Sequence, residues 1–136
     1  MPAFGNRSRA NLETCDDRIQ EVFNEVIKHI DCSVLEGRRG KDRQNFLYDT
    51  GQSKVRFPDG KHNSSPSKAV DVAPYPIDWD NKERFILFAG FVLGIAQSKG
   101  ITLRWGGDWN KDFDTKDTAF FDAPHFEHRD RDWETG

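Results

Sequence analysis

Apolar residues recur at helical spacing in the first third of the chain. Between residues 19 and 30 they follow the i, i+3, i+4, i+7 pattern of a helix with one buried face. These residues are Ile19, Val22, Phe23, Val26, Ile27 and Ile30. Thr14 is the expected N-cap of this helix, and Asp17 stands at the capping-box position. The pattern predicts an amphipathic helix that packs on a core.

Two further helices are predicted downstream. Residues 81–99 are strongly apolar and should form a central helix, with Asp80 and Glu83 as its capping box and Gly100 as its stop. Residues 41–50 form a shorter candidate, with two apolar residues that would point inward. The polar segment 51–66 is rich in turn formers and is expected to be a loop.

Short apolar runs predict the strands. They cover residues 32–35, 69–73, 101–105 and part of 120–128. In the second run Val70 and Val72 alternate with Asp71, so the carboxylate should project from the opposite face. About three helices packed on a small antiparallel sheet make an α+β fold in a single compact domain.

Length and charge place limits on this domain. The chain has 136 residues, which suits one domain over residues 1–136 with a core large enough to need no disulfides. Residues 1–11 are polar and are expected to form a flexible arm, and residues 129–136 a polar tail. A net charge of −3 gives no reason to expect nucleic acid as a partner.

Cysteine usage and hydropathy bear on the compartment. Cys15 and Cys32 are too few for a disulfide framework, and Cys32 lies in an apolar run as an expected buried thiol. The start of the chain lacks the apolar segment of a signal peptide, and residues 85–96 are too few to span a bilayer. We therefore expect a cytoplasmic protein without stable membrane insertion. The sequence shows no coiled coil and no exposed apolar stripe, so we expect a monomer.

Two histidines and one aspartate suggest a metal site. His62 and Asp71 flank one segment, and His125 follows far downstream. Two imidazoles and a carboxylate leave a tetrahedral zinc with one open position, which is typical of catalytic sites. Asp122 precedes His125 by three residues and could act as general base, while Glu127 shares a strand face with His125 and competes for that role.

The remaining polar and aromatic residues have simpler interpretations. His29 closes a helix and should interact with its C-terminal dipole. His128 is followed by charged residues and is expected in a solvated tail. Asp108 should cap a turn. The tryptophans at positions 79, 105 and 109 are expected mostly in the core, although one could line a substrate groove.

Several segments resemble a known enzyme family. His-Asn-Ser-Ser-Pro-Ser-Lys-Ala-Val-Asp at residues 62–71 resembles the first zinc motif of phage-type D-Ala-D-Ala-carboxypeptidase-like (VanY-related) endolysins, including L-alanyl-D-glutamate peptidases. Asp-Ala-Pro-His at 122–125 resembles their second zinc motif, and Leu-Arg-Trp-Gly-Gly-Asp-Trp at 103–109 the connection between the motifs. Gly-Arg-Arg at 37–39 matches the position of their substrate-polarising arginine.

The resemblance implies a role for each matched residue. His62, Asp71 and His125 would bind one Zn²⁺ per chain, Asp122 would be the general base, and Arg39 would stabilise the oxyanion. Arg38 is adjacent, so either arginine could face the site. The chain departs from many relatives at Gly60, where they have serine, and by a longer gap between the first two ligands.

The implied function is a zinc peptidase acting on the peptidoglycan stem peptide. It would hydrolyse the L-Ala–D-Glu bond as an endolysin, made in the host cytoplasm and reaching the wall after another protein permeabilises the membrane. A D,D-carboxypeptidase or dipeptidase acting on D-Ala termini is the nearest alternative. A non-catalytic, zinc-containing wall-binding module is an alternative of another class.

Overall fold

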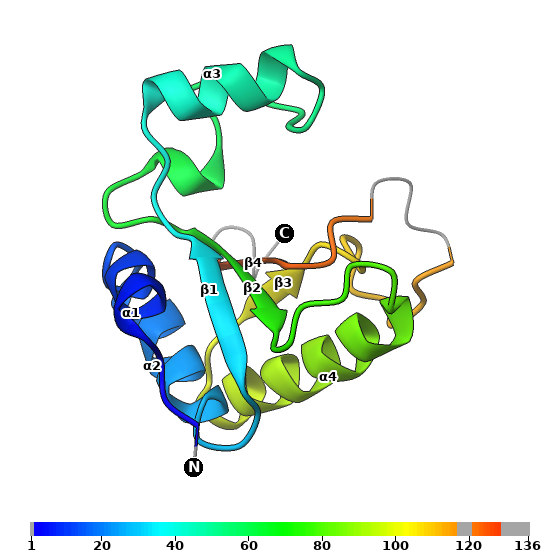
Figure 1. Ribbon diagram of the computed structural model, residues 1–136. Helices are drawn as coiled ribbons and strands as arrows, with labels where there is room; N and C mark the ends of the chain where they lie inside the picture. The colour runs from blue at the N-terminus through cyan, green and yellow to red at the C-terminus, as the bar shows by residue number, and fades with distance from the viewer. Residues whose placement is uncertain (1, 117–120, 129–136) are drawn as a thin grey trace.

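The short apolar runs form one antiparallel sheet. The computed structural model describes residues 2–116 and 121–128. Its strands are β1 (Cys32–Glu36), β2 (Ala69–Pro74), β3 (Leu103–Trp105) and β4 (His125–His128), in the order β1-β2-β4-β3 (Figure 1). The helices are α1 (Asn6–Glu13), α2 (Asp17–Val26), α3 (Lys41–Asp49), the 3-10 turn η1 (Lys61–Asn63) and α4 (Lys82–Ser98). The α+β prediction is confirmed.

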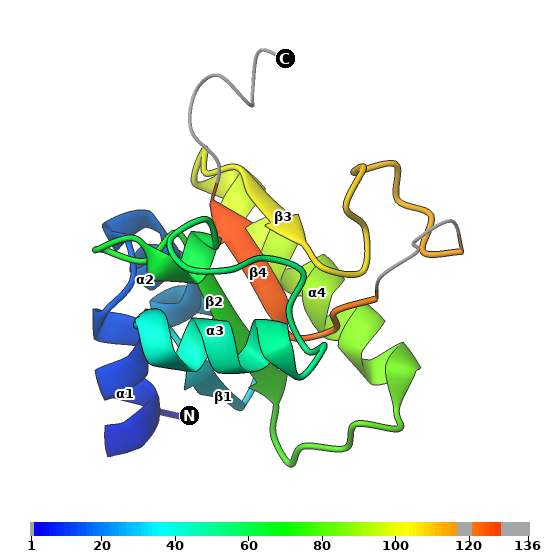
Figure 2. The same ribbon diagram turned by 90° about the horizontal axis from the view of Figure 1, so that it is seen from above.

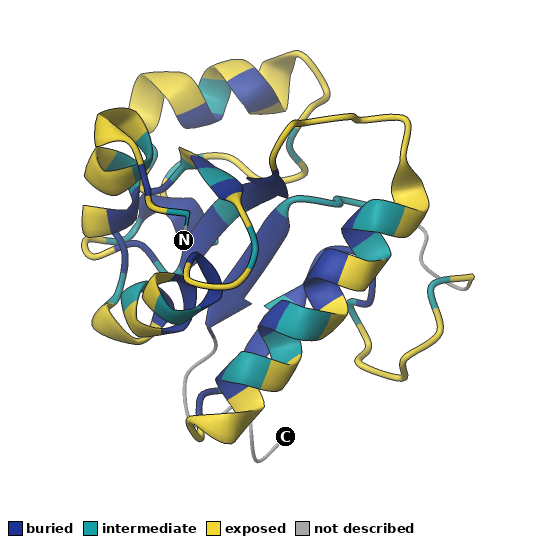
Figure 3. Cartoon of the chain, turned by 60° about the horizontal axis from the view of Figure 1, so that its bottom comes forward, coloured by how far each residue is buried: buried dark blue, intermediate teal, exposed yellow. Residues whose placement is uncertain are grey.

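The two faces of the sheet differ in character because side chains alternate along each strand. One face packs against α2 and α4, and burial decreases outward from this layer (Figure 3). Phe126 of β4 lies at its centre, with its ring edge-to-face against Phe23 of α2 and Phe88 of α4. The opposite face carries polar side chains and lies beneath α3 (Figure 2). Burial of the apolar face fixes which residues the polar face presents.

The expectation of a flexible arm over residues 1–11 is wrong. Most of that segment is helix α1, which lies along the free edge of β1. The Ser8 hydroxyl accepts from the Val34 amide at 3.0 Å, and the Asn11 amide donates to the Val34 and Leu35 carbonyls at 2.9 and 3.3 Å. An edge strand exposes unpaired backbone groups, and these polar side chains satisfy them. The polar residues of this segment suggested contact with solvent, whereas two of their side chains hydrogen-bond to the backbone of β1.

Some predicted helix ends shift by a few residues. Thr14 is the C-cap of α1, and the N-cap of α2 is Asp16, whose carboxylate accepts from the Arg18 amide. The N-cap of α4 is Asn81, the residue after the predicted Asp80, and its side chain accepts from the Arg84 amide. With α1 added, the described residues contain four α-helices instead of about three.

Two side chains lie where the sequence did not place them. Trp79 was expected in the core but is 58% exposed, with its ring stacked on Phe85. His128 was expected in solvent but is buried, with Nδ1 3.2 Å from the Thr102 carbonyl, because strand β4 extends to it. The predicted tail at 129–136 lies outside the described residues.

Other expectations agree with the structure. Cys32 and Cys15 are buried free thiols, and burial raises the pKa of each to about 12. Asp108 caps a turn, because its carboxylate accepts from the Asp112 and Phe113 amides. Among the described residues, no helix has the length and hydropathy needed to cross a membrane.

The contact between α1 and the sheet edge should contribute measurably to stability. Asn11→Ala leaves the Val34 and Leu35 carbonyls without their side-chain donor, so the free energy of unfolding should fall by about 1–2 kcal/mol. Arg7→Ala, an exposed position on the same helix, should change it by less than about 0.5 kcal/mol. Urea unfolding of both variants measures the difference. Equal free energies of unfolding for the two variants would show that Asn11 does not stabilise the contact between α1 and the edge of β1.

Candidate metal centre

The sheet brings the three predicted metal ligands together on its polar face. Asp71 occupies β2 and pairs in register with His125 of β4. Their neighbours Val70 and Phe126 point into the core, so alternation directs Asp71 and His125 to the opposite side. His62 arrives from η1, which lies next to β2.

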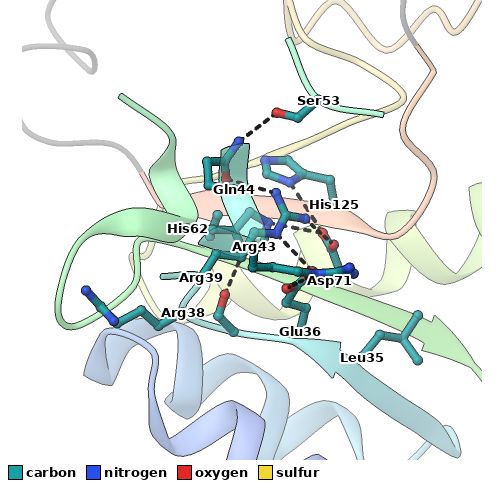
Figure 4. Close-up of polar contacts among 12 residues, drawn as sticks. Leu35, Glu36, Arg38, Arg39, Arg43, Gln44, Ser53, His62, Asp71 and His125 are labelled. Atoms are coloured by element: carbon teal, nitrogen blue, oxygen red, sulfur yellow. Dashed lines mark hydrogen bonds and ion pairs between the residues drawn. The ribbon is translucent and has the colours of Figure 1, made fainter. Parts of the chain in front are cut away.

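The ligand atoms converge on one point. Asp71 Oδ1 lies 3.3 Å from His62 Nε2 and 3.4 Å from His125 Nδ1. One donor atom from each of the three residues falls within 4.8 Å of the others. The two imidazole rings stand edge to face with centroids 5.2 Å apart. Figure 4 shows these side chains pointing toward one another from separate segments.

The backbone sets the tautomer of His62. Its Nδ1 lies 2.7 Å from the Gly37 carbonyl, which can only accept a hydrogen bond. Nδ1 therefore carries the proton and Nε2 presents its lone pair toward Asp71. Glycine at position 37 permits close packing on another side, since a Cβ there would lie 2.2 Å from Thr14 Oγ1 and 2.3 Å from the Asn11 carbonyl oxygen.

A carboxylate sets the tautomer of His125. Glu127 Oε1 lies 2.9 Å from Nε2, and Arg104 Nη2 lies 2.8 Å from the other Glu127 oxygen. Arg104 pairs directly across from Glu127 in the β3–β4 ladder. In the neutral form that a metal ligand requires, His125 thus donates Nε2–H to Glu127 and keeps the Nδ1 lone pair for the centre. A carboxylate behind a histidine in this way is a common support of metal ligands.

The donor set fits a metal ion. His62 Nε2 and Asp71 Oδ1 are buried, and neither has a hydrogen-bond partner among the described residues. Buried polar atoms without partners are costly, and a cation between them would remove that cost. Two nitrogens and one oxygen match the three-ligand set of a catalytic zinc site.

The protonation equilibria show that the centre favours positive charge. Burial alone would raise the pKa of Asp71, but the imidazoles of His125 and His62 hold it well below its usual range. Burial alone would lower the pKa of His125, but Asp71 and Glu127 raise it to about 9. Burial would raise the pKa of Glu127 too, yet His125 and Arg104 bring it to about 2. A metal ion would supply the cation that these shifts favour.

Asp122 lies at the open side of the centre. Its Oδ2 is 3.9 Å from His125 Nδ1, and its side chain is 33% exposed. Burial and the charge of Asp71 raise the pKa of Asp122. The backbone holds it in place, since the Asp122 amide donates to the Gly106 carbonyl at 2.9 Å. A Cβ at Gly106 would lie 2.2 Å from the Asp122 carbonyl oxygen, so glycine permits this contact.

The adjacent arginines point in different directions. Arg39 Nη2 lies 3.1 Å from Asp71 Oδ2, and its Nε lies 2.9 Å from Glu36 Oε1. Arg38 is exposed and extends away from the centre in Figure 4. A register shift in β1 between Val34 and Glu36 precedes this turn. The structure thus brings Arg39, and not Arg38, to the predicted site.

Sequence reasoning missed three supporting residues. Gln44 is fully buried and joins α3 to the centre: its amide donates to Ser53 Oγ and the Val55 carbonyl, and its oxygen accepts from Arg39 at 3.4 Å. Trp109 lies against His125, with ring centroids 5.3 Å apart. Arg104 appeared in the sequence analysis only as part of the motif at residues 103–109. Its position opposite Glu127 becomes evident only once the strands are paired.

A cavity of about 290 Å³ opens onto these residues. His62, His125, Asp122 and Arg39 line it, together with part of the segment between α3 and η1 and with Gln44, Lys61, Trp109 and Glu127. A ligand in the cavity would therefore contact the donor atoms and Asp122 together. Three side chains that could bind a metal, a carboxylate with a raised pKa and an adjacent cation form an arrangement typical of a hydrolytic metal centre.

Comparisons with known proteins agree with this class. Residues 2–128 match the sequence model of the family described as phage L-alanyl-D-glutamate peptidase, and the chain belongs to that family of peptidases. The L-alanyl-D-glutamate peptidase of Escherichia phage T5 is 29% identical over 134 residues, covering 91% of this chain and 96% of that protein. The crystal structure of the Serratia marcescens L-Ala D-Glu endopeptidase ChiX matches with a TM-score of 0.76 and 26% identity, covering 97% of this chain and 94% of that one.

The geometry predicts one high-affinity metal ion per chain. His62→Ala, Asp71→Ala and His125→Ala should each abolish stoichiometric Zn²⁺ binding, because each removes one of three ligands. His29→Ala is the matched control, since His29 is half exposed and contacts Glu25 and the ring of Phe91, neither of which is a candidate ligand. Elemental analysis and calorimetric titration measure the effect. Full zinc content in all three variants would contradict the assignment.

Proposed function

We propose that this chain is a zinc-dependent endolysin that hydrolyses the L-Ala–D-Glu bond of the peptidoglycan stem peptide. The observation that carries the proposal is the convergence of His62, Asp71 and His125 beside Asp122 in a member of this peptidase family. The phage T5 and Serratia relatives carry the same bond specificity in their names, which supports the choice of bond.

Zinc is the metal that the donor set suits best. Two neutral imidazoles and one carboxylate are characteristic of catalytic zinc, and the converging lone pairs are held by Gly37 and Glu127. When bound, the ion would supply Lewis acidity toward a water molecule and the substrate carbonyl. The side chains of the protein supply the proton transfers and the orientation.

Asp122 is the proposed general base. It lines the cavity, is partly exposed, and makes no hydrogen bond through its side chain that would occupy it in the described structure. Its raised pKa makes the carboxylate a better proton acceptor than an ordinary aspartate. We infer that Asp122 takes a proton from the attacking water and returns it to the departing amine of D-Glu.

Glu127 suits a supporting role better. Its two oxygens are engaged by His125 Nε2 and Arg104, and it is 3% exposed. Its lowered pKa makes it a weak base. The carboxylate therefore holds the orientation of a metal ligand and strengthens its donor atom.

Arg39 is the proposed cation for the oxyanion. It lines the cavity beside His62, and Glu36, Gln44 and Asp71 fix its guanidinium in place. A preorganised positive charge stabilises the tetrahedral intermediate without the cost of reorienting. Its contact with Asp71 also orients the ligand carboxylate, so Arg39 serves both the metal centre and the substrate.

The two alternatives are less well supported. A D,D-carboxypeptidase would act on D-Ala termini, whereas the matched family and both relatives are named for the L-Ala–D-Glu bond. A wall-binding module would need no base, yet Asp122 stands at the open side of the centre with a raised pKa. Both observations favour the endopeptidase.

The bond can be identified from the products. Purified sacculi digested with the zinc-loaded protein should yield peptides with new D-Glu amino termini, while L-Ala stays on the glycan. Mass spectrometry after amino-terminal labelling identifies both products, and chelator-treated protein is the control. Release of D-Ala with no D-Glu termini would assign the carboxypeptidase activity instead. Stoichiometric zinc with no digestion would assign the binding module.

Substitutions at Asp122 and Glu127 should distinguish the general base from the residue that supports a metal ligand. Asp122→Asn should lower kcat by about 10²–10⁴-fold and keep zinc, because only the proton acceptor is lost. Glu127→Gln should weaken zinc affinity by about 10–100-fold and recover most activity when zinc is in excess. Steady-state rates over a zinc titration distinguish the two. The reverse ranking at saturating zinc would make Glu127 the base.

A further inference from the structure

A second groove adjoins the metal centre on the far side of Asp122. It has a volume of about 410 Å³ and is lined by Trp79, Lys82, Phe85 and Phe121 together with residues 122–124. We call it the aromatic groove. Asp122 lines both this groove and the cavity over the metal ligands. A substrate lying across Asp122 would therefore occupy both.

The aromatic groove presents a fixed, open ring face. The indole of Trp79 stacks on Phe85 with centroids 5.4 Å apart and planes inclined by 14°. Phe85 is 1% exposed and anchored in the core, while Trp79 remains 58% exposed. Lys82 places its ammonium 4.4 Å from the centre of the Phe121 ring on the opposite wall. Core packing does not account for an indole that is supported on one side and open on the other.

The two hollows differ in chemistry. The cavity over the metal ligands is lined by three cations, Arg39, Lys54 and Lys61, and by the acids Asp59, Asp122 and Glu127. These cations could pair with D-Glu, whose α-carboxylate is free in the stem peptide. Apart from the shared Asp122, the aromatic groove offers ring faces and one amine, which suit an amphipathic, uncharged ring.

The chemistry of the substrate places a sugar on this side. In peptidoglycan, L-Ala is joined through the lactyl group to the pyranose of N-acetylmuramic acid. If D-Glu occupies the cavity over the metal ligands, L-Ala crosses Asp122 and the sugar follows it directly. An extended chain advances at most about 3.6 Å per residue, so the sugar must bind close to the scissile bond. The aromatic groove is the hollow next to Asp122 on that path.

We propose that the aromatic groove binds the N-acetylmuramyl sugar, with the pyranose stacked on the open face of Trp79. This inference rests on the proposed function, because it extends the same substrate beyond the bond that is cut. Trp79 acts in binding and not in the chemical step. The groove thereby sets the direction of the substrate across the centre and favours wall fragments over free peptides.

Kinetics on two substrates tests the proposal. The substrates are N-acetylmuramyl-L-Ala-D-Glu-diaminopimelate and the same peptide with an acetyl group replacing the sugar. Wild type should show the lower KM for the muramyl peptide. Trp79→Ala should raise that KM by about threefold to tenfold, the range expected for one aromatic contact, with kcat and the acetyl-peptide KM unchanged. Trp79→Tyr should restore most of the preference.

A matched control removes another exposed apolar side chain. Leu87 is 76% exposed on α4 and lies outside the groove, so Leu87→Ala should leave both KM values unchanged. Thermal unfolding and zinc content of each variant detect a general loss of structure. An equal rise in KM for both substrates, or none for either, would overturn the sugar site.

A binding measurement separates this proposal from the proposed function. N-acetylmuramyl-L-alanine lacks the scissile bond, so its affinity for the zinc-loaded protein does not depend on catalysis. Calorimetry should show affinity weakened by about threefold to tenfold in Trp79→Ala and unchanged in Leu87→Ala. That result would support the groove even if sacculi were cut at another bond. Equal affinity in wild type and Trp79→Ala would reject it even if the L-Ala–D-Glu bond is cut.

Discussion

The arrangement of this protein depends on one mostly buried carboxylate, that of Asp71 on β2, whose Oδ1 atom is fully buried. A charge removed from water costs several kcal/mol unless partners compensate for it. Here His62, His125 and Arg39 surround the carboxylate, and each comes from a different segment of the chain. The requirement to compensate Asp71 therefore brings η1, β4 and the turn after β1 to one place. A metal ion bound between these side chains would complete that compensation and would link the stability of the fold to the chemistry of the site.

A second set of contacts makes the centre rigid. The Gly37 carbonyl and the Glu127 carboxylate fix the protons of the two imidazoles on their outer nitrogens, so both lone pairs face Asp71. Gly37 directly follows β1 and Glu127 lies on β4, and the sheet between them is closed on one side by the core around Phe126. The ligands consequently need little rearrangement to accept a cation. Asp122 remains more exposed, as suits the group that we propose exchanges protons with substrate and water.

Local patterns in the sequence were enough to identify most elements and the residue types of the centre. Periodicity located α2, α3, α4 and the core strands, because the burial of one face imposes a spacing that can be counted. Alternation around Asp71 placed its side chain opposite Val70 and Val72, as the structure shows. The resemblance of the two motifs led to the family that the comparisons establish. Helix α1 was missed because its polar side chains bind the edge of β1, and such partners leave no hydrophobic period.

The tertiary structure alone decided which of the competing residues meet at the centre. In the turn after β1, Arg39 faces the centre and Arg38 is exposed. The β3–β4 pairing places Arg104 on Glu127, and Asp122 stands at the open side. Trp79 lines the aromatic groove because its indole stacks on Phe85 of α4, a contact that exists only in the folded chain. Sequence by itself determined the secondary structure, the core faces and the types of ligand, because those follow from the order of neighbouring residues. Pairings between distant segments depend on strand register and close packing, which no local pattern encodes.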